Sequence, residues 1–284
     1  MLNIRVICPS NSFKEEDKKV INKIVGKLEK DNFKVSFGKN IFKKEKYYDC
    51  ANIKDRLYDL EEALNDNNVD IIICGKGGFN SNQLLPYLKE YKRKKFIGMS
   101  DNTILVIALN KYLDTYLGPN FLGLDNEDNY NYFLEIINNK KYKISLKEEN
   151  IIKKGNVSGT IIGANLCTLN LLQGTKYINE KDNVILFIED DDNYKEGSFF
   201  KEFDRNLESL LQSNIFNIKC ILFGKFEEST KINKDMIKRM INNKIKNIPI
   251  YYNIDIGHVF PILTLPINKK CIIKDNEIII KDMI

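Results

Sequence analysis

The feature that most constrains the fold is an apolar segment followed at once by a run of glycines. Residues 69–74 read Val-Asp-Ile-Ile-Ile-Cys, and residues 75–78 read Gly-Lys-Gly-Gly. A nearly continuous apolar run of this length is typical of a strand that is buried on both faces of a parallel sheet. The glycines that follow indicate a tight loop at the carboxyl end of that strand. The segment therefore predicts an α/β fold with a buried parallel sheet.

Strand-like and helix-like segments alternate through the first 110 residues. Further strands are predicted over 3–8, 34–37 and 96–99, and helices over 13–31, within 47–64, over 82–91 and over 102–110. This alternation predicts a doubly wound, mostly parallel sheet. Sites in such sheets lie beyond the carboxyl ends of the strands. The turns at 9–12 and 75–80 and the residues around Ser100 are therefore expected to gather at one edge.

The pattern changes after residue 122. Residues 123–154 are more polar and are expected to form a linker region, whereas residues 155–284 contain several short β-like runs. We therefore divide the chain into an N-terminal α/β domain over 1–122, this linker region, and a C-terminal β-rich α/β domain over 155–284.

Ser100 lies in a turn between a predicted strand and a predicted helix. Asp101 and Asn102 are suited to cap that helix. The unpaired N–H groups at a helix N-terminus can stabilise a developing negative charge, so Ser100 is a candidate nucleophile. An ordinary turn is the alternative, because Asn102 replaces the second glycine of the Gly-x-Ser-x-Gly elbow.

Two residues of the C-terminal half could assist such a serine. Glu189 directly follows the apolar run 184–188, and a strand end is a rigid platform for a carboxylate that orients an imidazole. His258, the only histidine, lies in a turn between Gly257 and Pro261, where a base could be held in position. Residues 190–192 are three further aspartates, which we expect to form a solvated acidic loop; no metal site is expected there.

Composition excludes several classes of function. The chain has 284 residues and a net charge of +5, and its basic clusters are short, so nucleic-acid binding is not expected. No apolar stretch approaches the ~20 residues of a membrane span, and residues 2–8 resemble a strand more than a signal peptide. The six cysteines include no Cys-x-x-Cys pair, which favours reduced thiols in a cytoplasmic protein. The glycine turn matches no phosphate-binding motif, so no cofactor is expected.

Five segments, in chain order, resemble motifs of the LD-carboxypeptidase and microcin C immunity protein family of serine peptidases. They are the glycine motif at 76–86, Phe-Ile-Gly-Met-Ser-Asp at 96–101, the segment 159–175, Leu-Phe-Ile-Glu-Asp at 186–190, and Gly257-His258 with Leu-Thr-Leu-Pro at 263–266. Met99 stands where the family usually has tyrosine, and Ala164 stands where it has glycine.

The resemblance implies a catalytic triad and an oxyanion hole. Ser100 would be the nucleophile, His258 the general base and then acid, and Glu189 the group that orients the imidazole. The backbone N–H groups of Gly78 and Asp101 would bind the oxyanion. The family fold places its active site between the N-terminal α/β domain and the C-terminal β-rich domain, and many members are homodimers, so a homodimer is expected.

The resemblance is less specific about the substrate. Asn80 and Asn165 lie in two of the matching motifs and are our candidate substrate-binding residues. The Asn-Ser-Asn run at 80–82 is closer to the microcin-immunity branch, which cleaves a peptidyl or aminoacyl amide of a nucleotide-like group, than to murein LD-carboxypeptidases. Some members stack the base on a tryptophan, which this chain lacks; a tyrosine or phenylalanine could substitute. A third interpretation is a non-catalytic protein that binds a small ligand.

Overall fold

The computed structural model describes residues 1–138, 142–192, 197–242, 244–245 and 247–281. The chain divides into an N-terminal unit, Met1–Phe133, and a C-terminal unit, Leu134–Ile284. The division falls within 123–154, the range that its polar composition suggests as a linker. That range holds helix α4 (Glu127–Asn138) and two short strands of the C-terminal unit.

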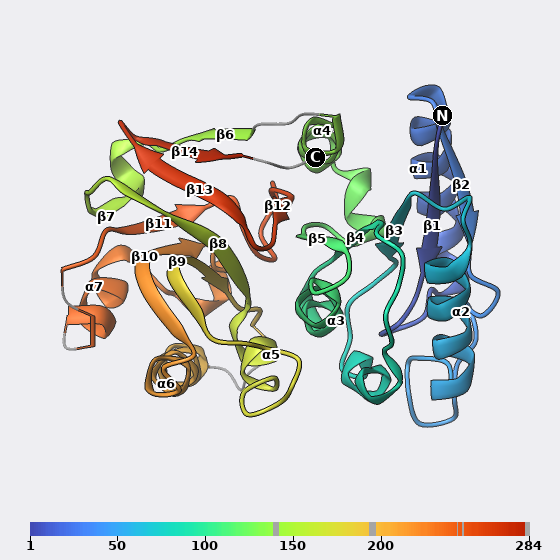
Figure 1. Cartoon of the computed structure of the whole chain (residues 1–284), viewed down its shortest axis with the longest axis horizontal. Helices are drawn as coiled ribbons and strands as arrows, with labels where there is room; N and C mark the ends of the chain where they lie inside the picture. The colour runs from blue at the N-terminus through green and yellow to red at the C-terminus, as the bar shows by residue number, and fades with distance from the viewer. Residues whose placement is uncertain (139–141, 193–196, 243, 246, 282–284) are drawn as a thin grey trace. The chain divides into compact units, whose positions relative to one another are not determined.

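Five strands of the N-terminal unit pair in parallel, in the spatial order β2-β1-β3-β4-β5 (Figure 1). Their bounds are β1 (Leu2–Ile7), β2 (Phe33–Phe37), β3 (Ile71–Cys74), β4 (Lys95–Gly98) and β5 (Asp114–Leu117). All four residues of β3 are buried, as the apolar run predicts. The order of connection reverses between β1 and β3, and doubly wound sheets bind ligands at the carboxyl ends beside such a reversal. The doubly wound sheet is therefore confirmed.

Amphipathic helices cover this sheet. They are α1 (Lys18–Lys30), α2 (Ile53–Asn65) and α3 (Thr103–Leu109), with the 3-10 turns η1 (Glu15–Asp17), η2 (Ser81–Tyr87), η3 (Ser100–Asn102) and η4 (Phe121–Asp125). α1 packs against β2, α2 against β1, and α3 against β4 and β5. Every residue of α3 is buried, so the helix that follows Ser100 is fixed in the core.

Two segments of this unit differ from the prediction. The α-helix expected over 82–91 is the 3-10 helix η2, which contains Pro86. Proline has no N–H and disfavours the α conformation of the residue before it, so a regular α-helix cannot form there. Strand β5 was not predicted, because the Gly-Pro pair at 118–119 makes residues 116–120 resemble a turn.

The C-terminal unit contains a mixed sheet in the order β6-β14-β13-β8-β9-β10-β11-β7. Its central strands β8, β9, β10 and β11 are parallel, and the outer pairings are antiparallel. The strands of the unit are β6 (Tyr142–Ser145), β7 (Ile151–Lys153), β8 (Val157–Asn165), β9 (Lys181–Glu189), β10 (Phe216–Gly224), β11 (Ile250–Ile254), β12 (Leu265–Pro266), β13 (Lys269–Lys274) and β14 (Glu277–Ile280). The β-rich α/β character predicted for this half is confirmed.

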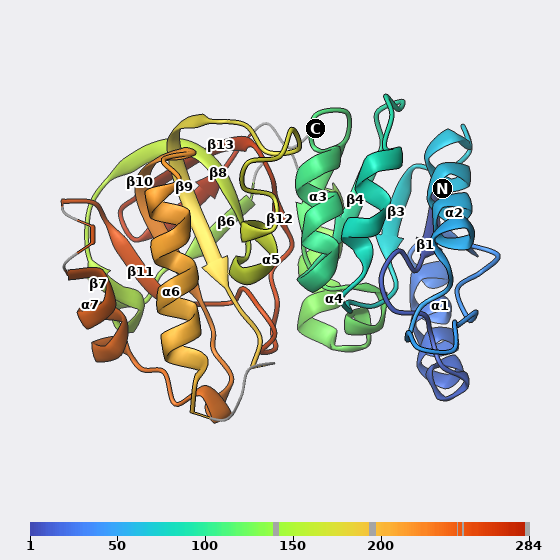
Figure 2. The same cartoon turned by 90° about the horizontal axis from the view of Figure 1, so that it is seen from below.

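Helices also cover the C-terminal sheet. They are α5 (Leu166–Asn170), α6 (Phe199–Gln212) and α7 (Lys234–Asn242), with the 3-10 turns η5 (Glu148–Asn150) and η6 (Glu228–Thr230). Figure 2 shows α6 lying across β9 and β10. Phe203 of α6 contacts Phe223 of β10, with ring centroids 6.2 Å apart. Among the described residues, no helix is both long enough and apolar enough to cross a membrane.

Candidate active site

Ser100 occupies a strained backbone conformation at the carboxyl end of β4. Its φ angle is +59°, in the left-handed region that residues with a side chain rarely adopt. Such a conformation costs on the order of 1–3 kcal/mol and persists only where the surroundings enforce it. The serine therefore projects from a sharp strand-to-helix turn even though the second glycine of the common elbow motif is absent.

The glycine turn after β3 packs directly against this serine. A Cβ atom at Gly77 would lie 2.9 Å from both Cβ and Oγ of Ser100. A Cβ atom at Gly78, whose φ is +157°, would lie 2.5 Å from Oγ of Ser10 and from Oδ1 of Asn11. Only glycine allows the backbone to approach this closely. The turns after β1, β3 and β4 thus meet at one sheet edge, as predicted.

Hydrogen bonds join the three turns. Oδ2 of Asp101 accepts bonds from Oγ of Ser10 at 2.6 Å and from the backbone N–H of Ser81 at 2.8 Å. Nδ2 of Asn102 donates to the carbonyl oxygen of Lys76 at 2.7 Å and to Oδ1 of Asn120 at 3.2 Å. These contacts hold Ser100 in its strained turn from both sides.

The C-terminal unit brings together the acid and the base that the sequence predicts. Glu189 is the last residue of β9, and His258 lies in the loop after β11. Nδ1 of His258 is 2.8 Å from Oε2 of Glu189. Glu189 is completely buried, and Nε2 of His258 has no hydrogen-bond partner among the described residues. The carboxylate therefore orients the ring and leaves Nε2 as the nitrogen that can accept a proton.

Two glycines make room for this pair. A Cβ atom at Gly224, the last residue of β10, would lie 2.4 Å from the carbonyl oxygen of Ile256 and 2.9 Å from Cβ of Glu189. A Cβ atom at Gly257, whose φ is +114°, would lie 3.1 Å from Oε2 of Glu189. The loop that carries His258 can therefore pass close enough to β9 for the imidazole to reach the carboxylate.

The surroundings raise the pKa of His258 to about 9. Burial alone would lower it, because burial disfavours the charged ring. The charge of Glu189 and its hydrogen bond to the ring act in the opposite direction, as do the charges of Asp191 and Asp190, and together they outweigh burial. The imidazolium is thus strongly stabilised beside this acidic strand end.

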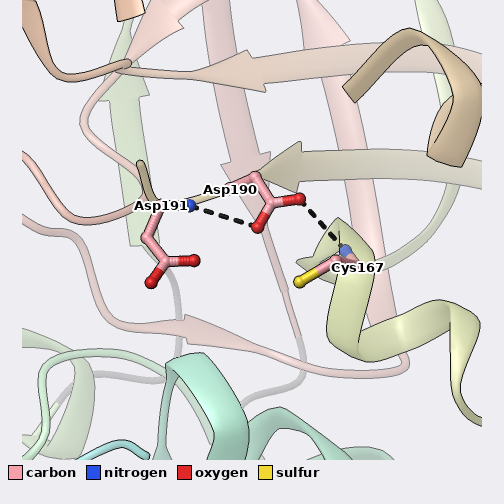
Figure 3. A group of neighbouring side chains, drawn as sticks. All are labelled: Cys167, Asp190 and Asp191. Carbon is pink, nitrogen blue, oxygen red and sulfur yellow. Dashed lines mark hydrogen bonds between the residues drawn. The ribbon is translucent and has the colours of Figure 1, made fainter. Parts of the chain in front are cut away.

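The acidic residues after Glu189 are not all solvated. Asp190 is buried, so the expectation of a solvated loop is wrong for this residue. Its Oδ1 accepts a bond from Nδ2 of Asn165 at 3.0 Å. Figure 3 shows two further bonds: Oδ1 accepts from the N–H of Asp191 at 3.1 Å, and Oδ2 accepts from the N–H of Cys167 at 3.2 Å. Cys167, Asp190 and Asp191 each have a side-chain atom of a type that can bind a metal ion, and these atoms lie within 4.8 Å of one another. These hydrogen bonds give Asp190 a structural role in holding the end of β9 to the end of β8 and the start of α5.

The two asparagines proposed as substrate contacts have structural partners. Oδ1 of Asn165 caps α5 by accepting a bond from the N–H of Thr168 at 3.2 Å, and its amide nitrogen bonds Asp190. Nδ2 of Asn80 lies 3.4 Å from Sγ of Cys50. A role for either residue in binding substrate stays a prediction.

Sequence reasoning missed Ser10, Arg56, Ser81 and Asn120. Arg56 is buried and donates hydrogen bonds to the carbonyl oxygens of two of the three turns. The hydrogen bonds of these four residues join distant parts of the chain; Ser10 and Asp101, for example, are 91 positions apart. No signal in the sequence marks these residues, because the burial of Arg56 within α2 is seen only in the folded chain.

Comparison with known proteins decides the family. The LD-carboxypeptidase N-terminal domain matches residues 4–118, and the LD-carboxypeptidase C-terminal domain matches residues 158–273. The chain belongs to the LD-carboxypeptidase family. YocD of Bacillus subtilis (strain 168), provisionally named a carboxypeptidase, is 35% identical over 94% of this chain and 92% of its own length.

Other members of the LD-carboxypeptidase family extend this result. The microcin C7 self-immunity protein MccF of Escherichia coli is 28% identical over 88% of this chain and 84% of its own. The crystal structure of an MccF-like protein from Bacillus anthracis str. Ames has a TM-score of 0.90 and 33% identity, covering 99% of this chain and 97% of that one. The resemblance stated from five motifs is confirmed, and membership of this family supports a peptidase. The catalytic assignments stay predictions.

Proposed function

We propose that the protein is a serine carboxypeptidase that hydrolyses an amide bond through an acyl-enzyme, with Ser100, His258 and Glu189 as its catalytic triad. The observation that carries this proposal is the Glu189–His258 pair. Nδ1 is held 2.8 Å from a buried carboxylate, and Nε2 has no partner among the described residues. An imidazole oriented in this way is prepared to take a proton from a hydroxyl group.

The reaction would proceed in two steps. Oγ of Ser100 attacks the carbonyl carbon of the scissile amide while Nε2 of His258 takes the hydroxyl proton. The C–N bond then breaks, and the leaving amine takes that proton from Nε2, which leaves an ester on Ser100. In the second step water attacks the ester carbonyl and gives a proton to Nε2; the proton returns to Oγ as the C–O bond breaks.

The N–H groups of Gly78 and Asp101 would stabilise the tetrahedral intermediate. Both belong to turns that pack around Ser100 at the carboxyl edge of the N-terminal sheet. Removing one donor of an oxyanion hole typically lowers the rate by about 10²–10³. The proposal requires Oγ of Ser100 and Nε2 of His258 to meet in the active protein.

For the substrate, we propose an amide that joins an aminoacyl or peptidyl group to a nucleotide-like moiety. Two observations favour it: the Asn-Ser-Asn run at 80–82, and the 28% identity to MccF. The alternative is the L,D bond of a murein tetrapeptide. It is favoured by the murein tetrapeptide carboxypeptidase of Pseudomonas aeruginosa, which is 21% identical over 97% of this chain.

The test is a hydrolysis screen of both substrate classes, an aminoacyl sulfamoyl-adenylate and an L,D-linked tetrapeptide. Ser100→Ala, Glu189→Ala and His258→Ala should each lower kcat strongly without loss of the fold, as judged by circular dichroism. Glu180→Ala, at an exposed position before β9, is the matched control and should keep wild-type activity. Full activity of the His258 variant would remove the triad from consideration.

The same screen separates the remaining alternatives. Cleavage of the tetrapeptide alone would assign the protein to murein metabolism. A wild-type protein that cleaves neither compound and is not labelled at Ser100 by a fluorophosphonate would instead be a binding protein on this fold.

A further inference from the structure

We propose that Asp101 is a positioning residue whose carboxylate, together with the guanidinium group of Arg56, clamps the turns after β1 and β3 onto the turn that carries Ser100. The clamp would set the spacing of the two oxyanion donors, the N–H groups of Gly78 and Asp101. This inference rests on the proposed function, because it assigns a part to these residues in that reaction.

Asp101 holds one residue of each neighbouring turn. A single oxygen, Oδ2, accepts bonds from Oγ of Ser10, at 2.6 Å, and from the N–H of Ser81, at 2.8 Å. The backbone carbonyl of Asp101 accepts a third bond, from Oγ of Ser81 at 2.6 Å. Ser10 and Ser81 are completely buried, and Asp101 is buried as well. Because water cannot replace these bonds, their loss would change the relative positions of the turns.

Arg56 holds the same two turns at the adjacent residues. Its Nη1 donates to the carbonyl oxygen of Pro9 at 2.8 Å and to that of Asn80 at 2.9 Å. Pro9 directly precedes Ser10, and Asn80 directly precedes Ser81. A buried anion and a buried cation thus bind consecutive residues of the same two turns. Ser100 itself takes no part in these hydrogen bonds.

Gly78 connects the clamp to the proposed chemistry. The hydroxyl group of Ser10 donates a hydrogen bond to Asp101 and also lies beside Gly78. A Cβ atom at Gly78 would be only 2.5 Å from Oγ of Ser10. One buried hydroxyl group therefore touches both sides of the proposed oxyanion hole and fixes the distance between them. Donors of such a site must lie about 2.7–3.1 Å from the developing oxyanion. A loosened clamp should therefore weaken binding of the transition state much more than binding of the substrate.

The experiment measures how fast a fluorophosphonate labels Ser100, because the reagent forms an adduct that places an oxygen in the oxyanion hole. The dependence on reagent concentration separates the rate constant of bond formation from the binding constant of the reagent. In Asp101→Ala the rate constant should fall about 10²-fold, of the order found when one oxyanion donor is lost, with little change in the binding constant. Asp101→Asn should recover much of it, because an amide oxygen can accept both bonds.

Two smaller substitutions and a control variant distinguish a loss of positioning at the oxyanion hole from a general loss of stability. Ser10→Ala and Ser81→Ala each remove one hydroxyl group and should lower the rate constant about tenfold, and they keep the test open if Asp101→Ala does not fold. Asp59→Ala is the matched control. Asp59 is a buried carboxylate of the same unit that accepts bonds from the N–H groups of Lys39 and Asn40. It should lower Tm by a similar amount and leave labelling of Ser100 unchanged.

The outcomes distinguish the clamp from the proposed function. If wild-type protein is labelled at Ser100 and the Asp101 and Ser10 variants are labelled equally fast, the clamp is refuted and the nucleophile stands. An equal loss of rate in Asp59→Ala would also refute it, because destabilisation alone would then explain the effect. If the wild-type protein is neither labelled nor active on either substrate class, the proposed function falls, and the clamp falls with it.

Discussion

Replacing Glu189 with glutamine should lower the pKa of His258 from about 9 to near or below its ordinary value of 6.5. Burial pushes the pKa of the ring down, and the charge of Glu189 is the main influence that pushes it up. Glutamine keeps the size of the side chain and an oxygen that can accept the bond from Nδ1, but it removes the charge. Burial would then be opposed mainly by the charges of Asp191 and Asp190.

The size of the effect follows from the difference between 9 and 6.5. At pH 7 only about 1% of the wild-type rings would be neutral, since the pKa lies about two units higher. The raised pKa stabilises the folded protein by about 3 kcal/mol at low pH. This contribution is fully present below pH 6.5 and is lost as the pH rises through about 9, because the folded state then no longer binds the extra proton. The variant should show little of this pH dependence.

The assay is an NMR titration of the imidazole ring. His258 is the only histidine of the chain, so its ring protons need no assignment among several candidates. Wild-type and Ser100→Ala protein should titrate near pH 9, and Glu189→Gln at much lower pH. For the wild-type enzyme, kcat/KM should rise about tenfold per pH unit from pH 7 toward 9 as the base becomes neutral. A wild-type midpoint near 6.5, or one that Glu189→Gln leaves unchanged, would refute the reasoning.

Two further predictions concern packing. Gly77→Ala places a methyl carbon 2.9 Å from Oγ of Ser100 and should reduce fluorophosphonate labelling of that serine at least tenfold. The control is Gly26→Ala in α1, where nothing lies within 4 Å of the added methyl group; it should leave labelling unchanged and stabilise the helix by about 0.5–1 kcal/mol. Equal labelling of the two variants would contradict the close approach of Gly77 to Ser100. Phe203→Ala removes a completely buried ring of α6 and should lower the free energy of unfolding, measured by urea titration, by about 3–5 kcal/mol. Leu171→Ala, at an exposed position, should change it by less than about 0.5 kcal/mol. Similar values for the two variants would show that the ring of Phe203 is not buried.

Much of the fold was predictable because its strongest signals are local. Residues 71–74 of the apolar run at 69–74 are buried as β3, and the segment 13–31, predicted as a helix, contains α1, which buries Ile21 and Ile24. Segments whose structure depends on distant partners were harder to predict. Strand β5 follows no clear apolar pattern, and it forms because β4 offers it a parallel edge. The polar composition of 123–154 likewise conceals strand β6, whose pairing partner β14 lies more than 130 residues away.

The residues of the candidate site also differ in how far the sequence alone could identify them. His258 and Glu189 could be named from the sequence because the chain has one histidine and because the acid directly follows an apolar strand. Their pairing is now observed at 2.8 Å. The residues around Ser100 could not be named, because Ser10 and Arg56 look like an ordinary turn residue and an ordinary helix charge. Only the folded chain brings them to Asp101 and to the carbonyl groups of the neighbouring turns.

These bracing residues explain how the chain tolerates the conformation of Ser100. A left-handed serine costs on the order of 1–3 kcal/mol, and the elbow motif that usually relieves crowding with a second glycine is absent here. A buried hydrogen bond to a charged group contributes about 1.5–3 kcal/mol, so the two bonds to Oδ2 of Asp101 are sufficient to offset that strain. The turn is therefore held by its contacts with the turns after β1 and β3, which is why Gly77, Ser10 and Asp101 are expected to affect the reactivity of Ser100.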